Sequence, residues 1–398
     1  MTSDNRNFPH DIGGNNPMAT TDRAGAFVQQ PDGYKAFLPK PLPPKPPIRY
    51  DERLAGALSR ADRALGRLDG AAEILPNPDL FVAMYVRKEA VLSSQIENTQ
   101  ASLSDVLEYE AKVPARSHPP DVGEVVNYVR AMNYGLERLK KLPLSLRLIR
   151  EIHAKLLGGV RGGQRAAGEF RSGPNWIGPN GTGLSDAVFV PPPVPEMHTG
   201  LSQLESYLQR KDDATPLLLK IGMVHAQFET IHPFFDGNGR VGRLLITFLL
   251  CEKKVVQRPL LYLSRYLTEH KQAYYDWLMA VRLRGDWEGW LRFFLEGVAE
   301  VAAEATQKAR HIIALREAHE RIILSQGRSK PTARRLLDLL YTTPILSAAN
   351  AHQRLEISRP TAHTLFRHFE ELGFLREITG KGRNRVYRYQ PYVDLLNE

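Results

Sequence analysis

The chain has 398 residues, of which 42% are hydrophobic and 24% are charged, and it carries a formal net charge of +9 at pH 7. This length predicts two or three domains, and the positive charge permits an acidic partner such as nucleic acid without requiring one. A single cysteine excludes an internal disulfide framework. The absence of an apolar run of about 18 residues and of an N-terminal signal pattern predicts a cytoplasmic protein without a membrane span.

The N-terminal segment is polar and then rich in proline, and residues 38–47 read LPKPLPPKPP. Proline runs favour an extended polyproline conformation over a packed helix. We therefore predict that residues 1–48 form an extended arm that lies on the following domain. Binding to a proline-reading module is the alternative for this arm.

A series of helices is predicted after the arm, because apolar residues recur there at three- and four-residue spacing. These helices cover residues 50–69, 85–98, 104–110, 122–139 and 143–157. Within the last of them we expect His153 to be a packed core histidine.

The helix over residues 85–98 carries Ser93 and Glu97 four residues apart, and hence on one face. A carboxylate in the last turn is unfavourable to the helix dipole, which indicates that Glu97 has another partner. An ordinary helix end is the alternative interpretation.

Residues 158–195 are rich in glycine and proline and differ from the helical segments around them. Within this region, Ala187–Val190 indicates a short strand that prolines terminate. A long surface loop is the alternative, although long ordered loops in compact domains are often functional.

The most informative stretch is residues 231–243, IHPFFDGNGRVGR, which joins a helix over 216–231 to an apolar helix over 240–253. Backbone N–H groups at the start of a helix form a phosphate site, and Gly237 and Gly239 let the backbone approach an anion closely. The apolar helix contains Cys251, which we expect in the core rather than as a nucleophile.

Four side chains of this stretch carry chemistry. Arg240 and Arg243 lie on one helix face and can bind phosphate oxygens. Asp236 is suited to Mg²⁺, and His232 can accept a proton at neutral pH. Each feature alone fits an ordinary turn, helix end or solvated face, but together they indicate transfer of a nucleotidyl or phosphoryl group to a hydroxyl.

Two further helical segments are predicted between residues 231–243 and a C-terminal domain. Residues 286–294 predict an aromatic helix that packs in the core, and residues 298–324 predict a long charged connector. The sequence GRSKP at residues 327–331 breaks this connector and marks a domain boundary.

The C-terminal region resembles a winged helix-turn-helix. Helices are predicted over residues 334–340, 347–355 and 359–372, with Ser358 as the cap of the third, and strands over 376–379 and 383–389. DNA binding and protein docking or homodimer formation are equally open for such a module. The candidate DNA contacts are Arg359, Thr361, His363, Thr364, Arg367, Lys381, Arg383 and Arg385.

From His232 to Arg243 the chain resembles the Fic family signature, His-Pro-Phe-x-Asp-Gly-Asn-Gly-Arg-x-x-Arg. The resemblance implies transfer of AMP from ATP to a Ser, Thr or Tyr hydroxyl of a target protein. It also implies a role for each signature residue: His232 deprotonates the hydroxyl, Phe234 anchors the loop, Asp236 holds Mg²⁺ on the α- and β-phosphates, Gly237, Asn238 and Gly239 form the anion cradle, Arg240 steadies the phosphates and Arg243 reaches the γ-phosphate. Because the phosphate-transferring branch of the family carries Lys at the position of Gly239, the glycine favours AMP transfer.

Outside the signature, the segment from Ser93 to Asn98 resembles the inhibitory motif of one Fic subclass, which implies that Glu97 pairs with Arg243 and blocks productive ATP binding. The same glutamate could instead support removal of AMP from a modified protein. Gly168–Arg171 and residues 186–193 resemble family landmarks, which implies a β-hairpin flap whose edge pairs with the target. The flap residues are Asp186, Ala187, Val188, Phe189 and Val190.

The resemblance also places side chains beside the nucleotide. Tyr274 and Tyr275 would flank adenine, with packed core tyrosines as the alternative. Gln227 would lie near the loop, where an ordinary hydrogen-bonded helix residue is as good an interpretation, and Glu269 would close the pocket.

We therefore predict a mainly α fold, in which a Fic helical core with a small β-hairpin flap precedes a winged helix-turn-helix domain. The expected units are the arm at 1–48, the Fic domain at 49–310, a connector at 311–330 and the winged helix at 331–398. Two functions remain open: an AMP-transferring enzyme that uses ATP and Mg²⁺, and a DNA-binding regulator whose Fic core senses a nucleotide. The intact signature favours the enzyme, because a sensor would not need His232, Asp236 and both arginines.

Overall fold

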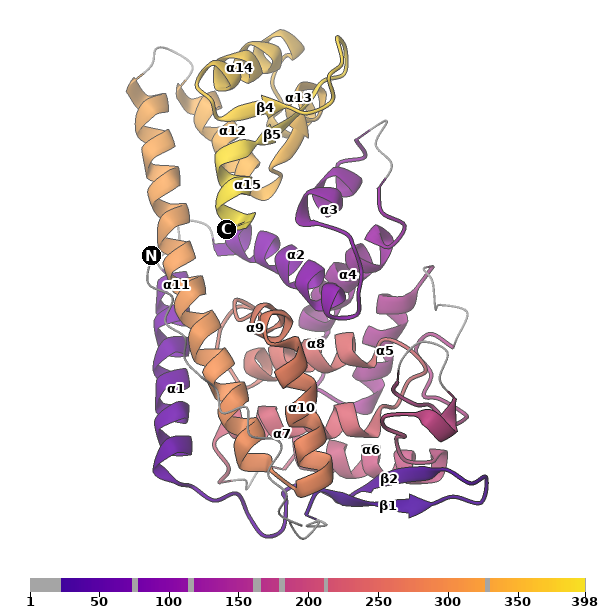
Figure 1. Cartoon of the computed structure of the whole chain (residues 1–398). Helices are drawn as coiled ribbons and strands as arrows, with labels where there is room; N and C mark the ends of the chain where they lie inside the picture. The colour runs from indigo at the N-terminus through magenta and orange to yellow at the C-terminus, as the bar shows by residue number, and fades with distance from the viewer. Residues whose placement is uncertain are drawn as a thin grey trace.

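A computed structural model describes residues 23–73, 78–113, 118–159, 166–178, 183–210, 214–325 and 330–397. The mainly α fold that we predict is confirmed: helices form both a core and a smaller C-terminal domain, and the strands are short (Figure 1). No helix among the described ranges combines the length and the apolar character needed to cross a membrane.

The N-terminal arm is partly folded. Strand β1 (Gly25–Gln29) pairs antiparallel with β2 (Lys35–Pro39), so these residues form a hairpin rather than the extended arm that we predict. A cross-strand aromatic pair stabilises the hairpin, because Phe27 lies opposite the buried Phe37 and the two rings pack edge-on with centroids 5.1 Å apart. Residues 1–22 of the predicted arm lie outside the described ranges.

The core is built around α7 (Leu217–Ile231), whose residues from Leu218 onward are all buried. A helix buried on every side lies at the centre of its domain. The surrounding core helices are α2 (Pro78–Ile96), α3 (Leu103–Glu110), α4 (Val122–Leu139), α5 (Leu146–Leu157), α6 (Val194–Leu208), α8 (Asn238–Glu252), α9 (Ser264–Glu269) and α10 (Lys271–Arg284). Helix α6 is not predicted from the sequence.

Helix α11 (Trp287–Ser325) is continuous over 39 residues and joins the aromatic helix and the connector that we predict separately. Helix α1 (Glu52–Glu73) packs along the first part of α11 (Figure 1). Near the other end, His319 stacks on Phe374 of the C-terminal domain at 3.8 Å. The predicted boundary at residue 310 therefore falls inside a helix that both domains share.

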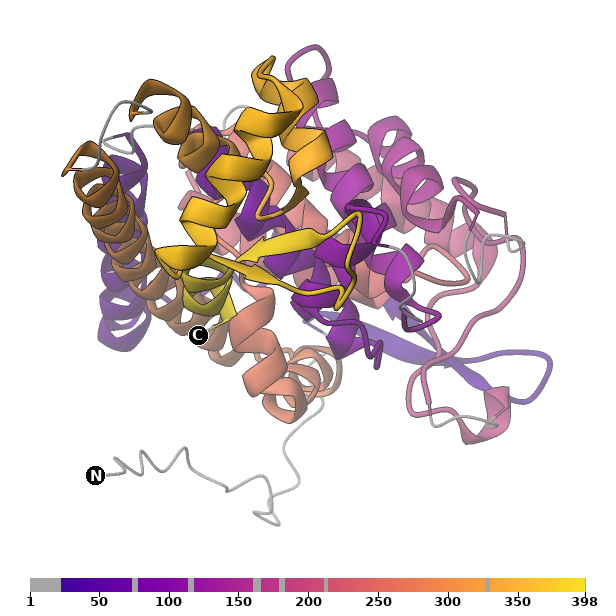
Figure 2. The same cartoon turned by 90° about the horizontal axis from the view of Figure 1, so that it is seen from above.

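The C-terminal domain has the predicted winged helix-turn-helix order and two additional elements. Its three-stranded antiparallel sheet has the order β3-β5-β4, and Ser358 caps α14 by accepting a hydrogen bond from Thr361 N–H. The sequence did not predict β3 or α15. The elements are α12 (Lys330–Thr342), β3 (Ile345–Ser347), α13 (Ala348–Leu355), α14 (Arg359–Glu371), β4 (Leu375–Glu377), β5 (Val386–Tyr389) and α15 (Gln390–Asn397). Seen from above, this domain lies over the core on the side of α2 and α3 (Figure 2).

The flap region is less regular than predicted. Instead of a strand over Ala187–Val190, a single antiparallel bridge joins Ile177 to Phe189, and Leu184–Asp186 forms one 3-10 turn. The N-terminal hairpin supplies the missing pairing, since Phe37 N–H donates to the carbonyl of Val190 at 2.9 Å.

Candidate active site

The signature loop begins where α7 ends. His232 has a left-handed backbone (φ 49°, ψ 61°), a conformation that non-glycine residues adopt infrequently and often at functional sites. Phe234 is buried and stacks on His153 at 3.7 Å, as expected for an anchor. The Asn238 side chain binds the backbone of Phe234. Asn238 Oδ1 accepts from Phe234 N–H at 2.9 Å, and Asn238 Nδ2 donates to Phe234 O at 2.7 Å.

Two buried residues from outside the signature hold the loop in place. His153 Nδ1 accepts from Gly168 N–H, so its Nε2–H donates to Asp236 O at 3.0 Å. Arg171 donates from Nε to His232 O at 3.0 Å and from Nη2 to Pro192 O. His153 is packed as expected, yet it also positions the loop, and Arg171 joins the loop to the end of the flap.

Replacing Asn238 with alanine is expected to lower the free energy of unfolding by about 1–3 kcal/mol, because the buried Phe234 N–H loses its acceptor and the Phe234 carbonyl keeps only the Asn175 Nδ2 donor. Denaturant unfolding measures this loss. Asn238→Asp keeps the acceptor but not the donor, so its effect should be smaller. Equal stability of the wild type and the alanine variant would show that the Asn238 side chain does not stabilise the loop.

An anion cradle lies at the start of α8. The first intrahelical bond runs from Val241 N–H to Gly237 O at 3.0 Å, so the N–H groups of residues 238–240 have no helical partner. Gly237 has φ 76°, which glycine adopts without strain. The Asn238 side chain is committed to Phe234, so only its backbone is available to a ligand.

The loop opens onto a cavity of about 680 Å³. The loop and α8 form one wall, the flap forms the second and α10 the third. The lining residues include Glu97, Asn175, Trp176, Ile177, Val188, Phe189, Glu229, His232, Asp236, Gly237, Asn238, Gly239, Arg243, Tyr274, Tyr275, Leu278, Met279 and Arg282.

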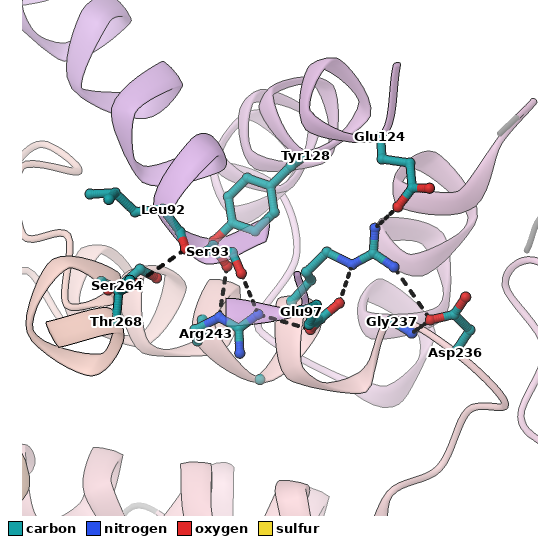
Figure 3. Close-up of polar contacts among 12 residues, drawn as sticks. Leu92, Ser93, Glu97, Glu124, Tyr128, Asp236, Gly237, Arg243, Ser264 and Thr268 are labelled. Atoms are coloured by element: carbon teal, nitrogen blue, oxygen red, sulfur yellow. Dashed lines mark hydrogen bonds and ion pairs between the residues drawn. The ribbon is translucent and has the colours of Figure 1, made fainter. Parts of the chain in front are cut away.

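Glu97 spans both signature arginines. One carboxylate oxygen lies 2.8 Å from Arg243 Nη2, and the other lies 2.7 Å from Arg240 Nε. Ser93 completes the contact, because its Oγ accepts from Arg243 Nε at 2.7 Å and its carbonyl accepts from Nη2 at 2.9 Å (Figure 3). Burial opposes ionisation of Glu97, but the two guanidinium groups outweigh it and lower the pKa of this carboxyl.

Arg240 is surrounded by carboxylates. Besides Glu97, its Nη1 lies 2.9 Å from Glu124 and its Nη2 lies 3.3 Å from Asp236. Glu124 comes from α4, and nothing in its local sequence indicated this contact. A phosphate would therefore compete with acidic side chains for Arg240 as well as for Arg243.

Gly239 is required by the same ion pair. A Cβ atom at this position would lie 2.6 Å from Glu97 Oε1 and 2.8 Å from Arg243 Nη1, which is closer than van der Waals contact allows. A side chain at position 239 and the observed Glu97–Arg243 pair are therefore incompatible without rearrangement.

The His232 imidazole lines the cavity with Nδ1 buried and without a hydrogen-bond partner among the described residues. Burial, helped by the positive charge of Arg282, lowers the pKa of His232 to about 3. The ring is therefore neutral at physiological pH, which is the form that accepts a proton.

Asp236 is the one signature carboxylate, and its side chain is 39% exposed. Its Oδ1 accepts from Gly237 N–H at 2.6 Å. Mg²⁺ is commonly held by one or two carboxylates together with substrate phosphates, so Asp236 beside the cradle fits this ion. No group of three or more His, Cys, Asp or Glu in the described ranges could hold a metal by protein ligands alone.

The predicted nucleotide residues outside the signature divide into two groups. Tyr274 and Tyr275 both line the cavity, but Tyr275 is 41% exposed, whereas Tyr274 is 1% exposed and its hydroxyl is hydrogen-bonded to His225 Nε2. Gln227 and Glu269 do not line the cavity. Gln227 donates to Lys40 O at 2.9 Å and so fixes the arm, and Glu269 pairs with Arg265.

Glu229 and Arg282 line the cavity but were not singled out from the sequence; each is 6% exposed. Arg282 lies 3.9 Å above the ring of Phe189 and donates to Glu229 O at 3.0 Å. Glu229 Oε1 is buried and accepts no hydrogen bond from any residue that the structure describes, and burial raises the pKa of this carboxyl to about 7. The signal for Glu229 in the sequence is an acidic residue three positions before His232, in a helix that is mostly apolar.

The predicted target-docking residues differ in exposure. Val188 is 60% exposed at the cavity rim, whereas Phe189 and Val190 are buried. Asp186 and Ala187 lie at the exposed turn that precedes them.

Comparison with known families agrees with this geometry. Residues 55–137 match the N-terminal region of the Fic/DOC family, residues 143–250 match the Fic/DOC family itself, and residues 334–387 match an HTH DNA binding domain. A crystal structure of a Fic family protein from Desulfovibrio desulfuricans G20 superposes with a TM-score of 0.57 at 22% identity, covering 86% of this chain and 98% of that chain.

Curated relatives carry the name protein adenylyltransferase. The chain is 30% identical over 176 residues to the protein adenylyltransferase Fic of Aedes aegypti, covering 43% of this chain and 32% of that protein. It is 28% identical over 204 residues to a probable protein adenylyltransferase of Aquifex aeolicus, covering 48% and 56%. The chain thus spans from about a third to just over half of these relatives. The chain therefore contains an N-terminal Fic/DOC region over residues 55–137 and a Fic/DOC domain over residues 143–250, which carries the signature loop.

Proposed function

We propose that this protein transfers AMP from ATP to a Ser, Thr or Tyr hydroxyl of a target protein and releases diphosphate. The main support is the joint placement, on one cavity of about 680 Å³, of a helix start with free N–H groups, a neutral imidazole and Arg243. The names of the curated relatives support AMP as the transferred group.

The reaction divides among the residues of the loop. The target hydroxyl oxygen forms a bond to the α-phosphorus while the bond from that phosphorus to the diphosphate oxygen breaks, and the hydroxyl proton passes to neutral His232. The N–H groups of residues 238–240 stabilise the charge on the phosphate oxygens. Asp236 would hold Mg²⁺, which neutralises phosphate charge when bound.

We further propose that Glu97 keeps the site inhibited. The carboxylate occupies the two guanidinium groups that a triphosphate would use, so ATP must displace it to bind productively. Glu97 could also assist water attack on an AMP-modified protein, which would make the protein bifunctional.

Target docking is assigned to the flap. Because the Val190 carbonyl already accepts from Phe37 N–H, a target strand would pair with the part of the flap nearer Asp186 and Val188. The exposed Val188 side chain would contact the target there.

Transfer of label from ATP tests the reaction. The Glu97→Gly protein is incubated with Mg²⁺ and cell lysate proteins, using ATP labelled at the α-phosphate in one reaction and at the γ-phosphate in the other. AMP transfer predicts protein-bound label from the α-position alone. Label from the γ-position alone would instead identify phosphoryl transfer.

A DNA-binding regulator with a nucleotide-sensing core is the second candidate, favoured by the HTH match at residues 334–387. It predicts salt-dependent duplex binding without any transfer of label. Under the enzyme hypothesis the winged helix recruits DNA, a target protein or a second copy of the chain.

A further inference from the structure

The winged helix and the core together form a basic cleft. This cleft, of about 960 Å³, lies between α14, the turn before β5 and the end of α3. The cleft is lined by five basic side chains and by one carboxylate, Glu370. None of the five basic side chains forms an ion pair within the ranges that the structure describes. The cations are Lys112, His363, Arg367, Arg383 and Arg385.

The positive charge of this face suits the phosphates of a nucleic-acid duplex. The helix after the turn of a helix-turn-helix reads the major groove, and the wing contacts the neighbouring backbone. Arg367 on α14 and Arg383 and Arg385 on the wing are exposed and therefore available to phosphates. Arg359 and Thr361 are exposed at the start of α14, outside the cleft, where base edges would be reached.

The core obstructs this face in the observed state. Ala111 and Lys112, at the end of α3, line the same cleft as His363 and Arg367. A recognition helix needs a groove about 12 Å wide to close around it, so a duplex and the end of α3 compete for the same space. Binding of a duplex therefore requires α3 to move.

A movement of α3 would also move Glu97, because the two are close in the chain. Glu97 lies in the turn between α2 and α3, and both helices are bonded to the winged helix. Arg388 of β5 lies 2.5 Å from the buried carboxylate of Glu108 on α3. Lys88 of α2 donates to the Leu396 carbonyl of α15 at 2.6 Å. Ser93, the second partner of Arg243, is also on α2.

We propose that binding of double-stranded DNA to the winged helix displaces α3 and thereby withdraws Glu97 from Arg240 and Arg243. The DNA-bound state and the inhibited state then exclude each other. This proposal rests on the inhibitory role assigned to Glu97. Because coupling between two sites is reciprocal, opening of the Glu97 contact must also strengthen DNA binding.

The test measures DNA affinity first, because affinity does not depend on AMP transfer. Binding of a fluorescent duplex of random sequence to the full chain is followed by anisotropy at low and moderate salt. Arg388→Gln releases α3 and should tighten binding by about five- to twentyfold. Loss of a positive charge alone would weaken binding, so the expected change has the opposite sign. Arg310→Gln, on the exposed face of α11, is the charge-matched control.

Three further measurements make the outcome decisive. Arg367→Ala should weaken binding and reduce the salt dependence by about one phosphate contact. Lys88→Met releases the winged helix from α2 and replaces Arg388→Gln should that variant fail to fold. The duplex should stimulate AMP transfer by the wild type but not by Glu97→Gly, which is already open.

The proposal is overturned if no duplex binds at low salt, which would leave this face to a protein partner. It is also overturned if both releasing variants bind DNA no more tightly than Arg310→Gln. Tighter binding by these variants without any transfer of label would retain the linkage and reject the proposed reaction, so the two failures are distinguishable.

Discussion

Glu97→Gly is expected to raise AMP transfer by about ten- to a thousandfold. The carboxylate contacts Arg243 at 2.8 Å and Arg240 at 2.7 Å in a site where both guanidinium groups are buried. Interactions of buried charge pairs amount to several kcal/mol, and 1.4 kcal/mol corresponds to a factor of ten in rate or population. Initial rates of α-label transfer to target protein measure the effect.

Glu124→Gln is the matched control for this experiment. It also removes a carboxylate from Arg240, at 2.9 Å, but leaves Arg243 paired with Glu97. Activation by Glu97→Gly alone would locate inhibition at Arg243, whereas equal activation by both would locate it at Arg240. Unchanged transfer by a folded Glu97→Gly protein that binds ATP would reject the inhibitory role.

His232→Asn is expected to reduce AMP transfer by about 10²- to 10⁴-fold, the usual contribution of a positioned general base. Asparagine tolerates the left-handed backbone of this position (φ 49°), so the loop should keep its shape. ATP affinity should stay near that of the parent, because the N–H groups of the cradle are unchanged. Rates and calorimetric ATP binding in the Glu97→Gly background separate the two effects.

The pH dependence gives a second readout for the same residue. Since burial and Arg282 lower the pKa of His232 to about 3, the ring stays neutral as the pH falls from 8 to 5.5. Transfer by a Glu229→Gln variant, which lacks the cavity carboxyl whose pKa is about 7, should therefore vary by less than about twofold across this range. His311→Asn, which does not line the cavity, is the control for loss of a histidine. A rate that halves near pH 6.5, or a His232→Asn protein with full activity, would contradict the assignment.

Local features could be predicted because neighbouring residues determine them. The signature is contiguous from His232 to Arg243, so its imidazole, glycines and arginines lie between the end of α7 and the first turns of α8. The cap at Ser358 and the order of the winged helix follow from the same kind of short-range pattern. The likeness of the segment from Ser93 to Asn98 to an inhibitory motif predicts a Glu97–Arg243 pair, and these two side chains lie 2.8 Å apart.

Contacts between distant segments were not predictable in this way. Helical spacing indicates which face of a helix is apolar but not which helix it faces. It therefore does not predict the contact of Glu124 with Arg240 or that of Arg171 with His232. For the same reason Gln227 was expected at the nucleotide, although it fixes the N-terminal arm through Lys40.

The sequence by itself determined which chemical groups the loop carries and the helical nature of both domains, because each depends on residues within a few turns of one another. The tertiary structure alone decided that one carboxylate spans both arginines and that a single helix, α11, belongs to both domains. It also decided that the winged helix contacts the helices on either side of Glu97. These outcomes depend on how helices pack, which is set by side-chain volume and buried charge across the whole core rather than by local pattern.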